Sequence, residues 1–257
     1  MRNIKLVYKY DGTDFYGFQR QTSARTVQRE IEKVLFTITK ENINLTSAGR
    51  TDRGVHAFMQ VSNFFTNCPI PTNKLLLTLN NALPLDISIT SVEEVDPNFS
   101  SRFSARERSY KYFLTLKKDP FSNRFATYTK EYIDLNKFLE VLEPLKGAHD
   151  FKNFKLADCT SKHQNREIFS ITGEQLNEYN IVIEIKGNAF LKSQIRIIIG
   201  TALDIYLGKK PKDYFHQMLT DFSKDFLKTV APPNGLFLSD IQYYENINYS
   251  NPTKQDL

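Results

Sequence analysis

The chain has 257 residues, 40% hydrophobic and 25% charged, a balance typical of a globular protein with one large or two medium domains. No apolar run approaches the length that crosses a bilayer, and residues 1–8 lack the apolar core of a signal peptide. The formal net charge of +5, from 34 basic and 29 acidic residues, permits a nucleic-acid partner without requiring one.

The first half of the chain alternates strands and helices. We expect strands at residues 4–10, 43–48, 57–66 and 87–95, and helices at 26–39 and 73–82. Thr26 is placed to cap the first helix, where apolar residues recur at the 3.6-residue period. On the third strand, alternation places Met59, Val61 and Phe65 on the inner face.

Aromatic side chains alternate with amide and cationic ones over residues 14–21. If exposed, a loop of this composition suits a ribose-phosphate backbone. If buried, it packs its three rings on the core. The sequence leaves both interpretations open.

The most informative stretch places an acid, Asp52, between Arg50 and Arg53. Gly49 and Gly54 flank these residues and let the backbone turn tightly. Such a loop can hold one carboxylate forward with cationic charge around it. Short charged loops are more often solvated turns, so this stretch alone makes Asp52 a candidate active carboxylate and no more.

The second half again mixes both kinds of element. We expect strands at residues 109–116, 167–172 and 180–187, a last strand ending at 244, and helices at 134–146, 189–207 and 211–219. Tyr110 ends the apolar face of the first of these strands, where its hydroxyl reaches a cleft or is satisfied in the core. Residues 152–166 read as a polar loop whose cations face phosphates or solvent: Lys152, Lys155, Lys162 and Arg166.

The helix expected at 189–207 is apolar nearly all round, which is typical of a buried helix, yet Arg196 lies in its middle. A guanidinium keeps its charge in a protein, and burying it without a partner is costly. Arg196 therefore needs a carboxylate, a substrate phosphate or a helix C-terminus, unless its stem reaches the surface. Asp52 is a candidate partner.

Both halves contain strands and helices in similar proportion. We predict an α+β fold with mixed, mostly antiparallel sheets in two lobes and an active-site cleft between them. Its parts are an N-terminal lobe at 1–104, a C-terminal lobe at 105–245 and a polar tail at 246–257. The first lobe carries the Asp52 loop, and the second carries Tyr110 and Arg196.

No metal or redox cofactor is predicted. None of the four histidines has a second histidine at metal-ligand spacing, and no dinucleotide-binding fingerprint is present. Cys68 and Cys159, the two cysteines, form neither a metal-type pair nor a disulfide framework. This cysteine usage indicates a reducing cytoplasm.

Several stretches point to one family when taken together. In chain order they are residues 10–13 (YDGT), 17–19 (GFQ), 26–28 (TVQ), 49–57 (GRTDRGVHA), 102–105 (RFSA), 110–112 (YKY), 190–191 (FL) with Arg196 and Gly200, 231–232 (AP) and 235–236 (GL). Their order and spacing resemble the TruA-type tRNA pseudouridine synthases along nearly the whole chain. The Asp52 loop is specific to that family among pseudouridine synthases.

The resemblance implies a homodimeric enzyme of two-lobed α/β subunits with a pseudouridine-synthase-like fold and no organic or metal cofactor. Its activity would be the isomerisation of uridine to pseudouridine at positions 38, 39 and 40 of the tRNA anticodon stem-loop. The alternatives are a non-catalytic RNA-binding module, in which Asp52 is a structural loop acid, and a pseudouridine synthase that acts on a different RNA.

The resemblance also implies roles for five residues. Asp52 matches the catalytic aspartate, Arg196 the arginine paired with it, and Tyr110 the tyrosine that lies against the target base. Arg50 matches an arginine that engages the RNA around the flipped nucleotide, and Leu236 an apolar residue that lines the pocket. The chain departs from the family beside Arg196, where Gln and Ile replace the usual Met and Val.

Overall fold

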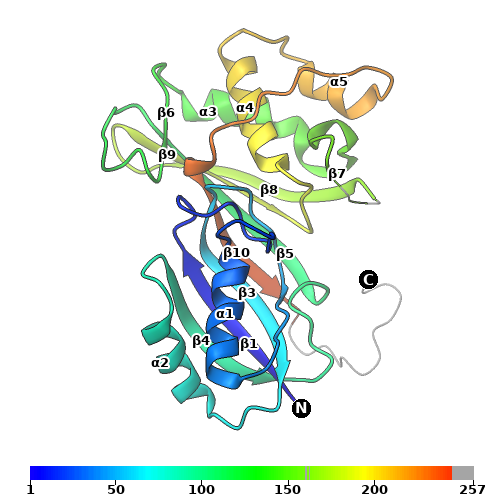
Figure 1. Cartoon of the computed structure of the whole chain (residues 1–257). Coiled ribbons are helices and arrows are strands. Elements are labelled where there is room, and N and C mark those ends of the chain that lie inside the picture. The colour runs from blue at the N-terminus through cyan, green and yellow to red at the C-terminus, as the bar shows by residue number, and fades with distance from the viewer. Residues whose placement is uncertain (160, 162, 245–257) are drawn as a thin grey trace. The chain divides into compact units, whose positions relative to one another are not determined.

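The computed structural model describes residues 1–159, 161 and 163–244, in which ten strands and five α-helices are assigned (Figure 1). Lys162 and the predicted polar tail at 246–257 lie outside the described residues. The chain divides into two compact units, here called unit 1 (Met1–Arg108 and the last strand from Leu238) and unit 2 (Ser109–Phe237). The lobes predicted at 1–104 and 105–245 stay predictions, because compactness alone does not define domains.

Unit 1 is built on antiparallel strands in the spatial order β4 (Ile87–Val95), β1 (Arg2–Tyr10) and β3 (His56–Thr66). A short strand, β2 (Thr46–Ser47), also pairs with β3. Tyr10 at the end of β1 lies opposite Ala57 at the start of β3. The loop that follows β1 and the loop that precedes β3 therefore emerge at the same end of these strands.

Two helices belong to unit 1, α1 (Val27–Thr39) and α2 (Thr72–Ala82). Figure 1 shows both in front of the strands of the unit, and α2 contacts β4 and α1. The expected cap of α1 is confirmed, since the Thr26 hydroxyl accepts a hydrogen bond from the Arg29 amide. The buried stripe of α1 includes Val27, Ile31 and Leu35.

The predicted inner face of β3 is partly wrong. Val61 is buried, but Phe65 is 42% exposed and Met59 is half-buried. Polar side chains of the alternate set are buried instead, because Gln60 donates to the Gly49 carbonyl and the Ser62 hydroxyl meets the Tyr8 hydroxyl at 2.7 Å. Satisfied hydrogen bonds thus overrode the apolar alternation.

Unit 2 contains the antiparallel strands β7 (Gly147–Asp150), β8 (Asn165–Gln175) and β9 (Asn180–Gly187), with β8 paired to both others. The pairing expected of residues 167–172 with 180–187 is confirmed. Strand β6 (Thr127–Tyr128) pairs in parallel with β5 (Ala105–Thr115). Strands β5 and β10 (Leu236–Tyr243) contribute residues to both units.

The helices of unit 2 are α3 (Leu135–Leu142), α4 (Gln194–Tyr206) and α5 (Tyr214–Thr220). Helix α3 contacts both α4 and β8. Asp134 caps α3 through the Lys137 amide, which confirms the start expected there.

Helix α4 starts later than the expected residue 189. Ser193 has a left-handed φ of 60°, and the Gln194 side chain accepts a hydrogen bond from the Leu191 amide at 2.7 Å. Residues 189–193 therefore form a turn that leads into the helix.

Candidate active site

The acid loop, defined as residues 48–55, connects β2 to β3 and carries Asp52 and Arg50. Asp52 is half-buried and Arg50 is exposed. The Asp52 carbonyl accepts a hydrogen bond from the Val55 amide at 3.2 Å, which closes a four-residue turn. Gly54, the third residue of that turn, has a φ of 77°. Asp52 thus opens a tight turn.

The residue before Asp52 is fixed to the core of unit 1. Thr51 is buried, and its hydroxyl lies 2.8 Å from the Tyr10 hydroxyl. Its carbonyl accepts a hydrogen bond from the Phe18 amide at 3.0 Å. Because the hydroxyl and the carbonyl of Thr51 are both engaged, the backbone that enters Asp52 has little freedom to rotate.

Val55, the last residue of the turn, packs against the Asp11-Gly12 turn that follows β1. A Cβ at Gly12 would lie 1.9 Å from the Val55 carbonyl oxygen, so glycine is required for this approach. The Gly12 amide donates to Nδ1 of His56, which is fully buried. His56 therefore has a structural position beside the acid loop.

The start of the acid loop is held as well. The Ala48 amide donates to the Val61 carbonyl at 2.9 Å, and the Ala48 carbonyl accepts from Nε of Arg108 at 3.1 Å. The Gly49 carbonyl accepts from the Gln60 side chain at 3.0 Å. The loop is therefore anchored on both sides of Arg50 and Asp52, whose side chains are its functional candidates.

Tyr110 lies on β5 in unit 2 and is 8% exposed. Tyr112 and Leu114 are also buried, which confirms the apolar face expected for this strand. The Tyr110 ring packs edge-to-face on Phe190, with ring centroids 5.3 Å apart. Phe190 belongs to the turn before α4, so this contact ties β5 to the start of that helix.

Arg196 lies in the first turn of α4 and is half-buried, rather than in the middle of the helix as expected. Its Nε donates to the Ala231 carbonyl at 2.8 Å, and the Ala231 amide donates to the Arg196 carbonyl at 2.9 Å. A Cβ at Gly200 would lie 2.3 Å from the Thr229 carbonyl oxygen. Glycine on this face lets the chain at Thr229–Ala231 lie directly on α4.

Residues 229–236, here called the strap, pack on Gly200 of α4 at Thr229–Ala231 and end at Leu236, the first residue of β10. The Tyr112 hydroxyl donates to the Pro232 carbonyl at 2.9 Å and lies 2.7 Å from the Thr127 hydroxyl. Burial raises the pKa of Tyr112, against the opposing effects of the Thr127 hydrogen bond and the Arg196 charge. Leu236, at the end of the strap, is 5% exposed.

The structure thus places Asp52 and Arg50 on one anchored loop of unit 1. In unit 2 it joins Arg196 to the strap that leads to Leu236, and it places Tyr110 on β5. Sequence reasoning assigned no part to Tyr112 and offered no backbone carbonyl as a partner for Arg196. The YKY and AP motifs pointed to these positions, but no sequence signal identifies which carbonyl accepts from which guanidinium.

Neither a metal-binding group nor a membrane span is found in the described part of the chain. No three His, Cys, Asp or Glu residues gather there as metal ligands could. No helix described is both long and apolar enough to cross a membrane.

Comparisons with known proteins agree with the motifs. The sequence profile of the family described as tRNA pseudouridine synthase matches residues 6–104 and 142–244. Proteins named tRNA pseudouridine synthase A are similar along almost the whole chain. One from Thermoanaerobacter sp. (strain X514) is 37% identical over 245 residues, covering 95% of this chain and 100% of that protein. One from Caldicellulosiruptor bescii is 42% identical over 248 residues, with the same coverage of 95% and 100%.

Among solved structures, a chain of a Cbf5-Nop10-Gar1 complex matches 77% of this chain and 43% of that chain. Its identity of 10% and TM-score of 0.38 are too low to carry weight. The profile match and the identity of the relatives decide the question and confirm the resemblance seen in the motifs. The chain belongs to the tRNA pseudouridine synthase family.

Proposed function

We propose that the protein isomerises uridine to pseudouridine in tRNA, at positions 38, 39 and 40 of the anticodon stem-loop, with Asp52 as the catalytic carboxylate. The observation that carries the proposal is the acid loop, which anchors the backbone on both sides of Asp52 and leaves Arg50 exposed. A carboxylate held on a fixed turn between cationic side chains suits catalysis beside a ribose in RNA.

The reaction breaks the N1–C1′ bond, turns the base and joins C5 to C1′. The proton on C5 leaves and N1 gains one, so nothing is oxidised and no group is lost. An ionised carboxylate beside the ribose serves as a nucleophile at C1′ or as a base that removes the 2′ proton. Asp52 supplies the carboxylate in either course.

Arg196 is proposed as the cationic partner of the Asp52 carboxylate in the tRNA complex. A cation in the first turn of a helix is opposed by the helix dipole, so helix stability does not account for Arg196. Its bond to Ala231 fixes the plane of the guanidinium, which suits recognition of a carboxylate.

Three residues serve the base and the RNA. Tyr110 lies against the target base and receives the C5 proton, directly or through water. Leu236 lines the pocket for that base, which must leave the helical stack to react. Arg50, exposed on the acid loop, engages the RNA around the flipped nucleotide. We further propose that the protein is a homodimer and acts in the cytoplasm.

The test is release of tritium from C5 of uridine. Wild-type protein and the Asp52→Asn variant are incubated with C5-tritiated transcripts of tRNA and of ribosomal RNA, and tritium in water is counted. We expect release from tRNA by the wild-type protein alone. Binding of tRNA without release would indicate the non-catalytic RNA-binding module, and release from ribosomal transcripts instead would indicate a different RNA substrate.

A further inference from the structure

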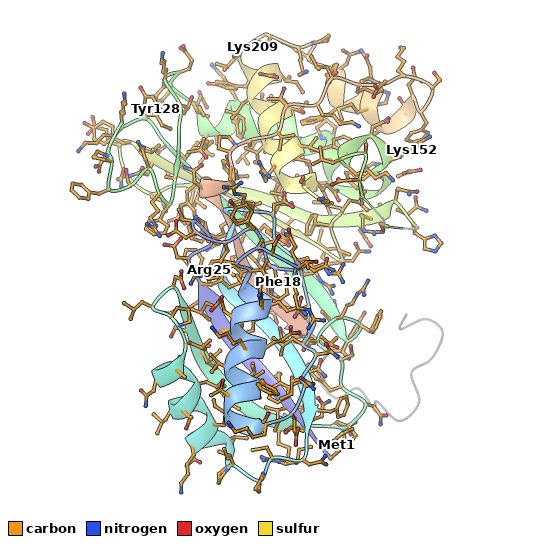
Figure 2. All side chains as sticks on the ribbon, in the orientation of Figure 1. Met1, Phe18, Arg25, Tyr128, Lys152 and Lys209 are labelled. Carbon is orange, nitrogen blue, oxygen red and sulfur yellow. The ribbon has the colours of Figure 1, made fainter. Side chains whose placement is uncertain are left out.

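The loop between β1 and α1 divides its three aromatic rings between the core and the surface. Phe15 and Phe18 are 1% and 2% exposed, whereas Tyr16 is 50% exposed. Phe18 and Arg25, labelled in Figure 2, lie near the N-terminal end of α1. The two buried rings anchor the loop, and core packing does not explain the third.

Tyr16 is stacked with the residue that follows the proposed catalytic acid. The guanidinium carbon of Arg53 lies 4.1 Å from the centre of the Tyr16 ring, and Arg53 is exposed. Among the residues that the structure describes, Arg53 forms no ion pair. Its cationic plane and the aromatic ring beneath it therefore face solvent next to Asp52.

A similar stack in the same loop shows the contrasting, structural case. The guanidinium carbon of Arg25 lies 4.1 Å from the centre of the Phe15 ring, and both Nη atoms bind the Asp86 carboxylate, at 2.7 and 2.9 Å. There the ring is buried and the charge is paired, so that stack stabilises unit 1. The Tyr16–Arg53 stack shares neither property.

The backbone around Tyr16 is fixed before any ligand arrives. The Tyr16 amide donates to the Arg25 carbonyl at 2.9 Å, and the Tyr16 carbonyl accepts from the Gln21 side chain at 2.9 Å. The Phe18 amide binds the Thr51 carbonyl, which ties this loop to the acid loop. A platform held in this way loses little conformational entropy when it binds a flat partner.

An open hollow lies beside this platform and is lined by Arg20, Gln21, Thr22 and Arg29. Gln21 joins the two, since its side chain binds the Tyr16 carbonyl. Arg20 is held by Glu32 at 3.1 Å, and Arg29 donates to the Thr22 and Ala24 carbonyls. The charge of Arg20 is thus paired, whereas the Arg29 guanidinium, oriented by these carbonyls, suits a phosphate of the strand whose base lies on the platform.

We propose that Tyr16 and Arg53 form a stacking platform for an unpaired base of the RNA that flanks the target uridine. Aromatic rings and arginine planes are the surfaces on which proteins stack unpaired bases, and Arg53 is adjacent to Asp52 in the chain. The platform thereby extends recognition beyond the flipped uridine to a neighbouring nucleotide. This inference rests on the proposed function for the identity of the RNA.

The test measures the dissociation constant of a fluorescent anticodon stem-loop RNA by anisotropy, with the full-length protein. Each loop nucleotide is replaced in turn by an abasic one. For the wild-type protein we expect one abasic position beside the target uridine to weaken binding about tenfold or more. In Tyr16→Ala the intact RNA should show that loss, and the same abasic position should add less than about twofold, because coupled sites are not additive.

Matched variants separate stacking from charge and from folding. Arg53→Lys keeps the charge but loses the plane, so binding should weaken at least about threefold. Tyr16→Phe keeps the ring and should recover most of the affinity that Tyr16→Ala loses. Lys74→Ala is the control for a lost cation. Lys74 is exposed on α2, which follows the end of β3 opposite the acid loop, so its removal should leave the affinity within about twofold of wild type.

The platform proposal would be overturned if, at every loop position, the abasic substitution weakened binding equally in Tyr16→Ala and in the wild type. An Arg53→Lys variant that binds as the wild type does would also overturn it. The proposed function is judged separately by tritium release. A wild-type protein that shows the predicted binding pattern but releases no tritium would overturn the catalytic proposal and leave the platform standing.

Discussion

Arg196 and Ala231 are joined by two hydrogen bonds that run in opposite directions. The side-chain Nε of Arg196 donates to the Ala231 carbonyl, and the Ala231 amide donates to the Arg196 carbonyl. The first bond fixes the plane of the guanidinium, and the second fixes the strap on the helix. Because Leu236 ends the same strap, a displacement of Arg196 would shift the backbone that leads to Leu236.

Arg196→Lys should lower kcat by about 10²–10³-fold, the cost of losing one oriented donor at a charged site. Lysine cannot present the planar fork, and it loses the Nε bond while the backbone bond to Ala231 remains. The melting temperature should therefore change little. Steady-state tritium release measures kcat, and a thermal melt measures the melting temperature.

Arg2→Lys is the matched control. Arg2 also donates to backbone carbonyls, those of Cys68 and Ile70, but it lies at the end of β1 opposite the acid loop. Its replacement should leave kcat unchanged. A near-normal kcat for Arg196→Lys would mean that Arg196 serves the strap alone.

Asp52→Asn should abolish turnover and retain tRNA binding, because it removes the anion at nearly constant shape. The turn at Asp52 is closed by its backbone carbonyl, which the substitution leaves in place. Asp96→Asn, at an exposed turn acid of unit 1, should keep full activity. Appreciable tritium release by Asp52→Asn above a contamination control would contradict the catalytic role.

The sequence predicted those elements whose signals are local. Helix α1 combines a periodic apolar stripe with a threonine that caps its start, and both signals lie within the helix or directly before it. The start of α4 was misjudged because Phe190 and Leu191 continue the apolar run, whereas the Gln194 side chain and the left-handed Ser193 decide where the helix begins. These are interactions that composition does not reveal.

The candidate site shows the same division. The acid loop was recognisable because its glycines and charges are contiguous in the sequence. The contact of Arg196 with Ala231 joins residues 35 positions apart through a backbone carbonyl, which has no residue type to recognise. The exposure of Tyr16 beside the buried Phe15 likewise depends on which ring the fold selects for the core.

Gly200→Ala should lower kcat more than it raises KM, with a loss of stability of about 1–3 kcal/mol. The added Cβ would lie 2.3 Å from the Thr229 carbonyl oxygen and 2.8 Å from the Ala231 amide, so the strap must move away from α4. That movement displaces the carbonyl that orients Arg196. Steady-state kinetics and thermal melts measure the two effects.

Gly208→Ala is the control that separates a general loss of stability, caused by backbone strain, from displacement of the strap. Gly208 follows α4 with a φ of 71°, and nothing lies within 4 Å of the position of an added Cβ. This variant should lose about 1 kcal/mol from its left-handed backbone and keep its kcat. Equal kcat losses in both variants would show that general destabilisation, rather than the strap, lowers the activity.

Two buried tyrosines should make the fold sensitive to alkali. Burial disfavours the charged phenolate and so raises the pKa of Tyr8 and of Tyr112 above the usual value. Both side chains are therefore neutral phenols in the folded state at pH values where an unfolded tyrosine ionises. Their contribution to stability is full below pH ~10, the unfolded pKa, and is lost as the pH rises above it. The loss per tyrosine reaches about 1.4 kcal/mol for each further pH unit.

Tyr112→Phe should therefore lower stability at pH 8 by about 1–2 kcal/mol, since its bonds to Pro232 and Thr127 are lost. Above pH ~10 its stability should fall less steeply with pH than that of the wild type. Urea unfolding at a series of pH values gives both slopes. Tyr132→Phe, at a side chain that is 70% exposed, should leave the wild-type slope unchanged. If Tyr112→Phe also kept that slope, ionisation of Tyr112 would not contribute to alkaline unfolding.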